Sequence, residues 1–266
     1  MSGIALTSEY FTPVNAKRST VLIIRGLRIV RHDPVSRAEF VLEVPEFEVL
    51  QCDRIGFVGP SGSGKTTFLE MLGLLIWPDE IESFFLSPDG DGRIIDIVPP
   101  ILQRNSDALT EIRANCMGFI MQDGGLLPYL SVFENARLAA ELSVGKNREN
   151  LQRITNSARA IGIGDLVHRM PASLSGGQRQ RAAVLRAVAA NPRLLIGDEP
   201  TASLDLSASE DVMALLASQA EARGAAVVLA SHNAKLLRRF GFRIARVSIE
   251  EGPALRRATL CMEENE

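Results

Sequence analysis

The chain has 266 residues, of which 46% are apolar and 23% are charged, and its formal net charge is −3. This composition is typical of a folded globular protein and excludes a disordered chain. A net charge this close to zero provides no general basic field for nucleic acid or anionic lipid. Any partner must therefore be identified from local motifs, and no nucleic-acid partner is expected.

The sequence shows no pattern for membrane insertion or secretion, so we expect the chain to stay in the cytosol. No run approaches the roughly 18 consecutive apolar residues that span a bilayer, and the first ten residues lack the charged-then-apolar pattern of a signal peptide. Cys52, Cys116 and Cys261 show neither Cys-x-x-Cys nor histidines at ligand spacing. They are interpreted as buried or incidental thiols rather than as a metal site or disulfides.

The first hundred residues alternate predicted strands with turns. Apolar runs predict strands at Val21–Ile24, Phe40–Leu50 and Arg54–Val58. Pro45 indicates an edge or a bulge in the second of them. The third strand leads through a glycine-rich turn into a predicted helix, Lys65–Leu75, which Trp77-Pro78 ends. The segment 79–100 is rich in Pro, Gly and Asp, so we expect loops with short strands there.

Between residues 101 and 171 the pattern is mostly helical. A strand is predicted at Met117–Met121. Ser131 and Glu134 match a capping box that opens a predicted helix over Val132–Leu142, and a second helix is predicted over Asn147–Ile161.

The remaining residues return to strand and helix alternation. An Ala-rich helix is predicted over Gln178–Ala190, followed by strands at Arg193–Ile196 and Ala225–Ala230. Between these strands, Ser207 with Glu210 is predicted to cap a helix that ends at Gly224. Residues Arg256–Glu266 are charged and predict a frayed tail.

The alternation as a whole predicts an α/β layered fold. The simplest organisation is one domain over residues 1–266. In it, about 20–100 and 176–250 would form the α/β core, and about 101–175 would form an inserted helical subdomain.

A glycine-rich segment between the third strand and the first helix fits the P-loop pattern. Glycines let the backbone wrap around phosphate oxygens, and the loop N–H groups and helix N-terminus supply partial positive charge. Lys65 would reach the β- and γ-phosphates, Thr66 would bind Mg²⁺, and Thr67 could donate to the α-phosphate. The alternative is a glycine-rich turn that carries Lys-Thr by chance. The motif consists of Gly59, Pro60, Ser61, Gly62, Ser63, Gly64, Lys65 and Thr66.

Two acids follow the apolar strand Leu194-Leu195-Ile196. A buried parallel strand delivers such carboxylates to the ligand crevice at its end. Asp198 would orient Mg²⁺, and Glu199 would act as general base on the attacking water. Read alone, the pair could equally cap the next turn, but the upstream P-loop favours catalysis.

A second anion site is predicted at the start of the helix near residue 176. Ser175 is a good N-cap, and the glycines after it bare the backbone N–H groups of the helix start. The alternative to an anion site is an ordinary capped helix that binds no ligand. The segment reads Leu174, Ser175, Gly176, Gly177 and Gln178.

These three motifs in this order resemble those of the ATP-binding subunits of ABC transporters, over about Val21–Val247. The resemblance implies an ABC ATPase fold, in which a mainly parallel P-loop core carries an antiparallel β subdomain and a helical subdomain. It implies ATP and Mg²⁺ as cofactors. It also implies a head-to-tail dimer in which Ser175, Gly176, Gly177 and Gln178 of one copy contact the nucleotide on the P-loop of the other.

Further family positions match one by one. Gln122 is similar to the Q-loop glutamine, which senses Mg²⁺ and the attacking water. Asp205, in Ser203-Leu204-Asp205, resembles the D-loop, which communicates across the dimer. His232 resembles the switch histidine that contacts the γ-phosphate. The family implies integral membrane permease subunits as partners and a location on the cytoplasmic face of the cell membrane.

The sequence departs from the family where an aromatic residue normally stacks on adenine. No Tyr, Phe or Trp lies in the segment Ile24–His32, so Arg31 or His32 would take that place. The segment from Gln122 to Asn135 resembles the lipoprotein-release and macrolide-export group. Its apolar side chains would either receive a permease helix or belong to the core, with neither favoured; they are Leu126, Leu127, Tyr129 and Leu130.

Soluble ABC ATPases form the rival class. Those acting on chromosomes place long coiled coils between the motifs, whereas Gln122 and Ser175 are only 53 positions apart (175 − 122) without sustained heptads. Those acting on ribosomes carry two cassettes, and this chain has one. An ATPase of an assembly or regulatory complex without transport stays open as the alternative.

Overall fold

The computed structural model describes residues 20–32, 39–88, 94–145, 148–251 and 255–262. Its strands form one sheet in the order β5-β4-β1-β2-β10-β9-β3-β8-β7-β6. In chain order they are β1 (Thr20–His32), β2 (Glu39–Leu50), β3 (Arg54–Val58), β4 (Ser83–Leu86), β5 (Ile95–Asp96), β6 (Met117–Ile120), β7 (Leu194–Asp198), β8 (Ala226–Ala230), β9 (Arg243–Glu251) and β10 (Leu255–Met262).

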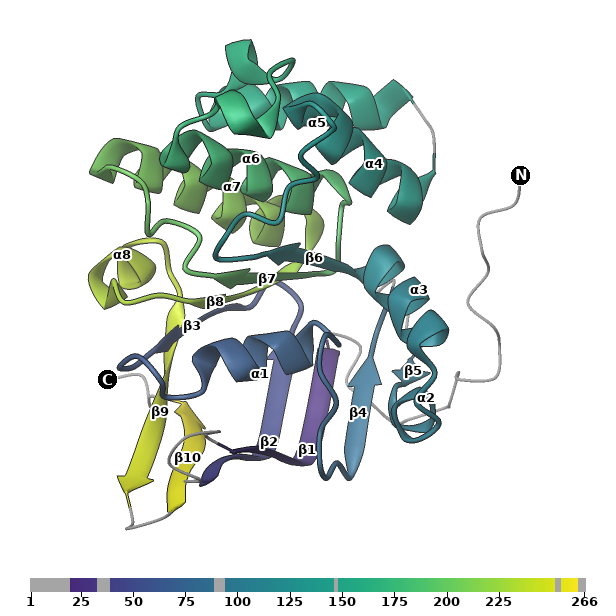
Figure 1. Cartoon of the computed structure of the whole chain (residues 1–266), viewed down its shortest axis with the longest axis vertical. Coiled ribbons are helices and arrows are strands. Elements are labelled where there is room, and N and C mark those ends of the chain that lie inside the picture. Colours follow the sequence, from purple (N-terminus) through teal and green to yellow (C-terminus); the bar gives the residue numbers. More distant parts are fainter. Residues whose placement is uncertain (1–19, 33–38, 89–93, 146–147, 252–254, 263–266) are drawn as a thin grey trace.

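The helices pack on both faces of this sheet and beyond its parallel end (Figure 1). They are α1 (Lys65–Leu72), α2 (Val98–Leu102), α3 (Ser106–Cys116), α4 (Val132–Val144), α5 (Arg148–Ala160), α6 (Gly176–Ala189), α7 (Leu206–Arg223) and α8 (Ala234–Arg239), with 3₁₀ turns at Gly164–Leu166 and Pro171–Ser173. This α/β layering confirms the predicted fold class.

The sheet combines a parallel half with an antiparallel half. Strands β9, β3, β8, β7 and β6 run parallel to their neighbours in that order. On the other side, β1 pairs antiparallel with β2 and β4, and β4 with β5. The two halves meet at β10, which is antiparallel to β9 and parallel to β2.

The central parallel strands are buried on both faces, which explains their continuous apolar sequence. In β7, Leu194 and Ile196 belong to the core under α1, whereas Leu195 belongs to the core under α6 and α7. In β8, Val228 and Leu229 divide in the same way. This alternation follows from the two-residue period of a strand, and it brings the carboxyl ends of β3, β7 and β8 to one edge.

The core under α1 has an aromatic centre. The rings of Phe47, Phe57 and Phe68 lie 5.1 to 5.8 Å apart between centroids, in the tilted and edge-on arrangements that aromatic pairs prefer. Phe57 comes from β3 and Phe68 from α1, so this cluster fixes the strand and the helix on either side of the P-loop.

Helices α1 and α7 differ from the prediction in where they end or how they are capped. Helix α1 ends at Leu72 rather than Leu75, because Leu74 adopts φ +54° and the chain turns after Gly73. Helix α7 is capped by Asp205, whose side chain accepts from the N–H of Ala208 at 2.9 Å, and not by Ser207. Glu210, expected in that cap, instead pairs with Arg239.

The expected frayed tail is a strand over most of its length. β10 pairs with β2 from Leu255 to Thr259 and with β9 from Arg256 to Met262, while 263–266 lie outside the described residues. Pro45 is not on an edge strand, since β2 lies inside the sheet. Pro45 lies between Val44 and Glu46, which pair with Leu27 and Arg25 of β1, and it has no register partner of its own in β1. The pairing of β2 with β10 ends before it, at Glu43.

The interior position of β10 can be tested at Ala258, which is fully buried between Leu42 and Ile249. Ala258→Asp should lower the free energy of unfolding by about 3 kcal/mol or more, because it buries an unpaired charge. The control Arg257→Ala removes only a partly exposed pair with Glu43 and should cost about 1 kcal/mol or less. Urea denaturation measures both, and two equally mild effects would mean a frayed tail.

Candidate functional site

The predicted phosphate loop lies between β3 and α1, at the carboxyl edge of the parallel strands. Gly62 and Gly64 have φ of +73° and +95°, a backbone region that favours glycine. Gly64 is the N-cap of α1 and gives the helix no side-chain capping bond. The first-turn N–H groups are therefore suited to bind an anion.

Lys65 extends along the inside of this loop. Its Nζ donates to the carbonyls of Gly59 at 2.8 Å and Pro60 at 2.9 Å. Burial lowers the pKa of Lys65, while the negative charges of Glu199 and Asp198 oppose that shift. The structure thus places a buried ammonium group between the phosphate loop and the two acids.

Asp198 joins the loop to the central sheet. It is the last residue of β7 and is buried. Its Oδ2 accepts a hydrogen bond from Thr66 Oγ1 at 2.7 Å, across 132 positions of the sequence. Two predicted metal-binding groups, one hydroxyl and one carboxylate, therefore lie in direct contact.

Glu199 stands beside this pair in a strained backbone conformation. Its φ is +49°, which is rare for a residue with a side chain, and its N–H donates to the carbonyl of Ala230 at 3.0 Å. The side chain is only 12% exposed, with Oε1 3.4 Å from His232 Nε2 and Oε2 3.4 Å from the His232 backbone N. Among the described residues, no donor hydrogen-bonds to Oε1.

The surroundings of Glu199 make its carboxylate more basic than an ordinary one. Burial raises the pKa of Glu199, and Asp198 adds to the rise. The charge and backbone N–H of His232, together with the charge of Lys65, lower the pKa in opposition. A carboxylate with a raised pKa is a stronger proton acceptor once it is deprotonated.

Gln122 follows β6, is exposed and faces the same cavity. The turn after it requires Gly124 and Gly125, with φ of +84° and +54°. Arg186 of α6 secures this turn by donating to the carbonyl of Gly125 and, at 3.4 Å, to that of Phe119. Sequence reasoning did not single out Arg186, because nothing in its local pattern indicates a contact with β6.

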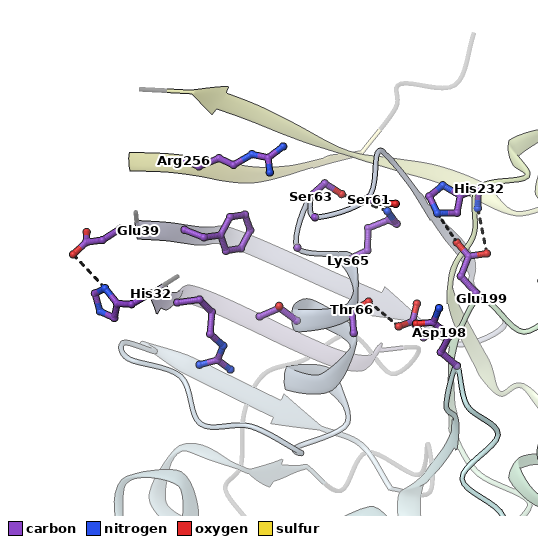
Figure 2. A pocket seen from close by; sticks show the side chains of 16 residues that line it. His32, Glu39, Ser61, Ser63, Lys65, Thr66, Asp198, Glu199, His232 and Arg256 are labelled. Atoms are coloured by element: carbon purple, nitrogen blue, oxygen red, sulfur yellow. Dashed lines mark hydrogen bonds and ion pairs between the residues drawn. The ribbon is translucent and has the colours of Figure 1, made fainter. Parts of the chain in front are cut away.

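These side chains surround one cavity of about 610 Å³. Figure 2 shows the pair Glu199–His232 at one end, the phosphate loop in the middle and the pair His32–Glu39 at the other end. The lining residues are Arg31, His32, Glu39, Phe40, Ser61, Gly62, Ser63, Gly64, Lys65, Thr66, Thr67, Gln122, Asp198, Glu199, His232 and Arg256.

Sequence reasoning missed three members of this lining: Glu39, Phe40 and Arg256. Both predicted substitutes for the aromatic, Arg31 and His32, do line the cavity. An aromatic ring is nevertheless present, because Phe40 of β2 is the register partner of Arg31. Pairing the two strands as a hairpin would have indicated it, whereas a search confined to the first strand did not.

The second predicted anion site lies apart from this cavity, since Ser175, Gly176, Gly177 and Gln178 are not among its lining residues in the described part of the chain. Ser175 caps α6 as predicted, in a capping box with Gln178. A methyl group placed on Gly176 would meet nothing within 4 Å, so its backbone is open to an approaching group. Asp205 is also absent from the cavity lining, and its carboxylate caps α7.

Comparison with known proteins gives concordant results. The profile of the ABC transporter family matches residues 42–202. The lipoprotein-releasing system ATP-binding protein LolD 2 of Caulobacter vibrioides is 34% identical, over 82% of this chain and 90% of that protein. LolD of Hyphomonas neptunium is 36% identical over the same shares.

Solved structures agree with this result. A dimeric structure of MJ0796, described as a bacterial ABC transporter cassette, superimposes with a TM-score of 0.70 at 27% identity, covering 85% of this chain and 93% of that one. A post-hydrolysis structure of the same cassette, bound to ADP and Pi, gives a TM-score of 0.68 at 27% identity.

The two glycines that open α6 should respond differently to the same substitution. A methyl group on Gly177 would lie 2.9 Å from the carbonyl oxygen of Ser203, so Gly177→Ala should cost about 1–3 kcal/mol of unfolding free energy. Gly176→Ala, in open space, should leave stability unchanged or slightly raised. Urea denaturation of both variants measures the difference, and a larger loss at Gly176 would contradict the described packing.

Proposed function

This chain belongs to the ABC transporter family, and we propose that it hydrolyses ATP at a site completed by a second copy and coupled to a membrane permease. Family membership makes it an ATP-binding, ATP-hydrolysing subunit. The observation that carries the proposed chemistry is the meeting of Lys65, Asp198 and Glu199 in the cavity at the phosphate loop.

Each residue of the cavity can be given a separate role in phosphoryl transfer. The loop N–H groups and Lys65 would hold the β- and γ-phosphates. Glu199 would remove a proton from the water that attacks the γ-phosphorus, and its basic carboxylate supports that role. His232 would hold this carboxylate through its backbone N–H and bring its ring to the γ-phosphate end.

Mg²⁺ fits the donor set of this site. The Thr66 hydroxyl and Asp198 carboxylate are oxygen ligands of the kind that Mg²⁺ prefers, and Gln122 faces the same cavity. Because Mg²⁺ is commonly held by one or two protein oxygens together with substrate phosphates, phosphate oxygens would complete the coordination. The ion would supply charge neutralisation at the β- and γ-phosphates.

A second copy of the chain would supply a further anion-binding group, the start of its helix α6, to the cavity. Ser175 and the open backbone of Gly176 lie outside the cavity of their own chain, yet form a helix start suited to bind an anion. In a head-to-tail dimer they would contact the γ-phosphate held by the other copy, with Gly177 and Gln178 shaping that helix start. The dimeric arrangement of the related MJ0796 cassette supports this pairing.

We infer a transporter of the lipoprotein-releasing type, because two of the relatives carry that name. In the described ranges, no helix has both the length and the apolar character required to cross a bilayer. Permease subunits would anchor the chain at the cytoplasmic face. Tyr129 and Leu142, 70% and 64% exposed, offer apolar surface for such a partner, whereas Leu126 packs against the core.

Glu199→Gln tests the base directly. The amide keeps the shape of the side chain but accepts no proton, so turnover should fall by about 10²-fold or more while ATP affinity is retained. Bound ATP should then hold the dimer together, as measured by light scattering with and without ATP. The exposed control Glu149→Gln should behave as wild type, and wild-type turnover in Glu199→Gln would refute the assignment.

The pH dependence of turnover should reflect the raised pKa of Glu199. Because the base must be deprotonated, kcat should fall on the acid side through a pKa above the ordinary 4.5. His232 lowers that pKa, so His232→Ala should shift the acid limb to higher pH, in addition to slowing the reaction. The kcat–pH profiles of both proteins measure this, and a shift to lower pH would contradict the described electrostatics.

A further inference from the structure

The cavity has a second wall, opposite the catalytic acids, made by three adjacent strands. Arg31 of β1 is in register with Phe40 of β2, and Phe40 is in register with Arg256 of β10. Register partners stand side by side on one face of a sheet, about 5 Å apart at Cβ. All three line the cavity, so they form a row in which a ring lies between two guanidinium groups.

This row contacts the phosphate loop directly. A methyl group placed on Gly64 would lie 2.7 Å from Cζ of Phe40, and one on Gly62 would lie 3.4 Å from Nη1 of Arg256. Arg256 points from β10 toward the loop that carries Ser61 and Ser63 (Figure 2). Its guanidinium therefore stands at the rim of the loop and not beside Asp198 or Glu199.

The order of groups along the cavity indicates which end of a bound nucleotide the row of Arg31, Phe40 and Arg256 would contact. Glu199 and His232 mark the end where the γ-phosphate reacts, and the loop holds the phosphates in the middle. The nucleoside of a bound nucleotide must then extend toward the opposite end, the side of the loop on which Arg256 stands (Figure 2). Arg31 and Phe40 line the cavity beside Arg256 through the strand register. Aromatic rings and planar guanidinium groups both stack on bases.

We propose that Arg256 is a nucleotide-binding residue through which the C-terminal hairpin β9–β10 contacts the nucleoside end of ATP, beside Phe40. This inference rests on the proposed function of the cavity and adds a third strand to its binding site. Arg256 supplies a planar cation against the base or ribose. The phosphates remain with the loop and Lys65.

The neighbouring Arg257 provides a matched control. It precedes Ala258 on the same strand, but its side chain pairs with Glu43 at 3.5 Å and does not line the cavity. The affinities of Arg256→Ala and Arg257→Ala for MgATP and for inorganic tripolyphosphate, measured by calorimetry on the full chain, separate the nucleoside contact from the phosphate contact.

Arg256→Ala should weaken MgATP binding about tenfold, the effect of one cation–π or stacking contact. Tripolyphosphate binding should change by less than about twofold, and Arg257→Ala should match wild type for both probes. Arg256→Lys should recover only part of the loss, because it keeps the charge without the plane. Unchanged ATP affinity in Arg256→Ala, or an equal loss for both probes, would overturn the proposal.

A second variant covers the case in which Arg256→Ala does not fold, and the wild-type protein tests the proposed function separately. If Arg256→Ala unfolds, Arg256→Met retains the apolar stem and answers the same question. If wild type binds neither MgATP nor tripolyphosphate, the proposed function itself fails, which is distinct from a failure confined to Arg256.

Discussion

The hydrogen bond from Thr66 to Asp198 is the contact on which the site depends. It fastens the start of α1 to the end of β7, two segments 132 positions apart in sequence, at 2.7 Å. The apolar core beneath it fixes both partners, because β7 is buried on both faces and α1 packs on one of them. The phosphate loop and the acids therefore reach a common geometry only when the whole parallel half of the sheet has folded.

Helix α6 connects this geometry to the surface that would meet a second copy. Its N-terminus carries Ser175 and Gly176, while Gln180 donates to the carbonyl of Glu199 at 3.3 Å. Arg186 holds the turn that follows Gln122. Helix α6 thus contacts the backbone of Glu199 and the turn after Gln122, and it carries the proposed interface at its N-terminus. A movement of α6 on dimerisation would therefore reach both segments.

The sequence alone predicted the parts of the site that depend on local pattern. The phosphate loop, Asp198 at a strand end and the cap at Ser175 each follow from a short segment with a clear physical requirement. Phe40 and Arg256 could not be found in that way, because their places depend on strand register: Phe40 on the β1–β2 hairpin, and Arg256 on the pairing of β2 with β10 at the far end of the chain. The adjacent residues Arg256 and Arg257 also break the apolar alternation of β10, so the sequence of that strand predicts a frayed tail and not a strand.

The choice of cap for α7 shows a similar limit. Asp205 and Ser207 both have side chains suited to an N-cap, and the sequence offered no means to prefer the first. In the structure Asp205 takes the cap, and Glu210 lies one turn later and pairs with Arg239. The position predicted to communicate across a dimer is therefore also the residue that fixes the start of α7.

The central claim, that one active site needs two chains, is tested most directly by mixing two inactive variants. Lys65→Ala removes the phosphate contact of one site, and Gly176→Asp places a negative charge where the partner's phosphate would lie, in space that the fold leaves open. An equal mixture forms mixed dimers with one intact composite site, so ATPase activity should return to about a quarter of wild type. A mixture as inactive as its components would contradict a shared site.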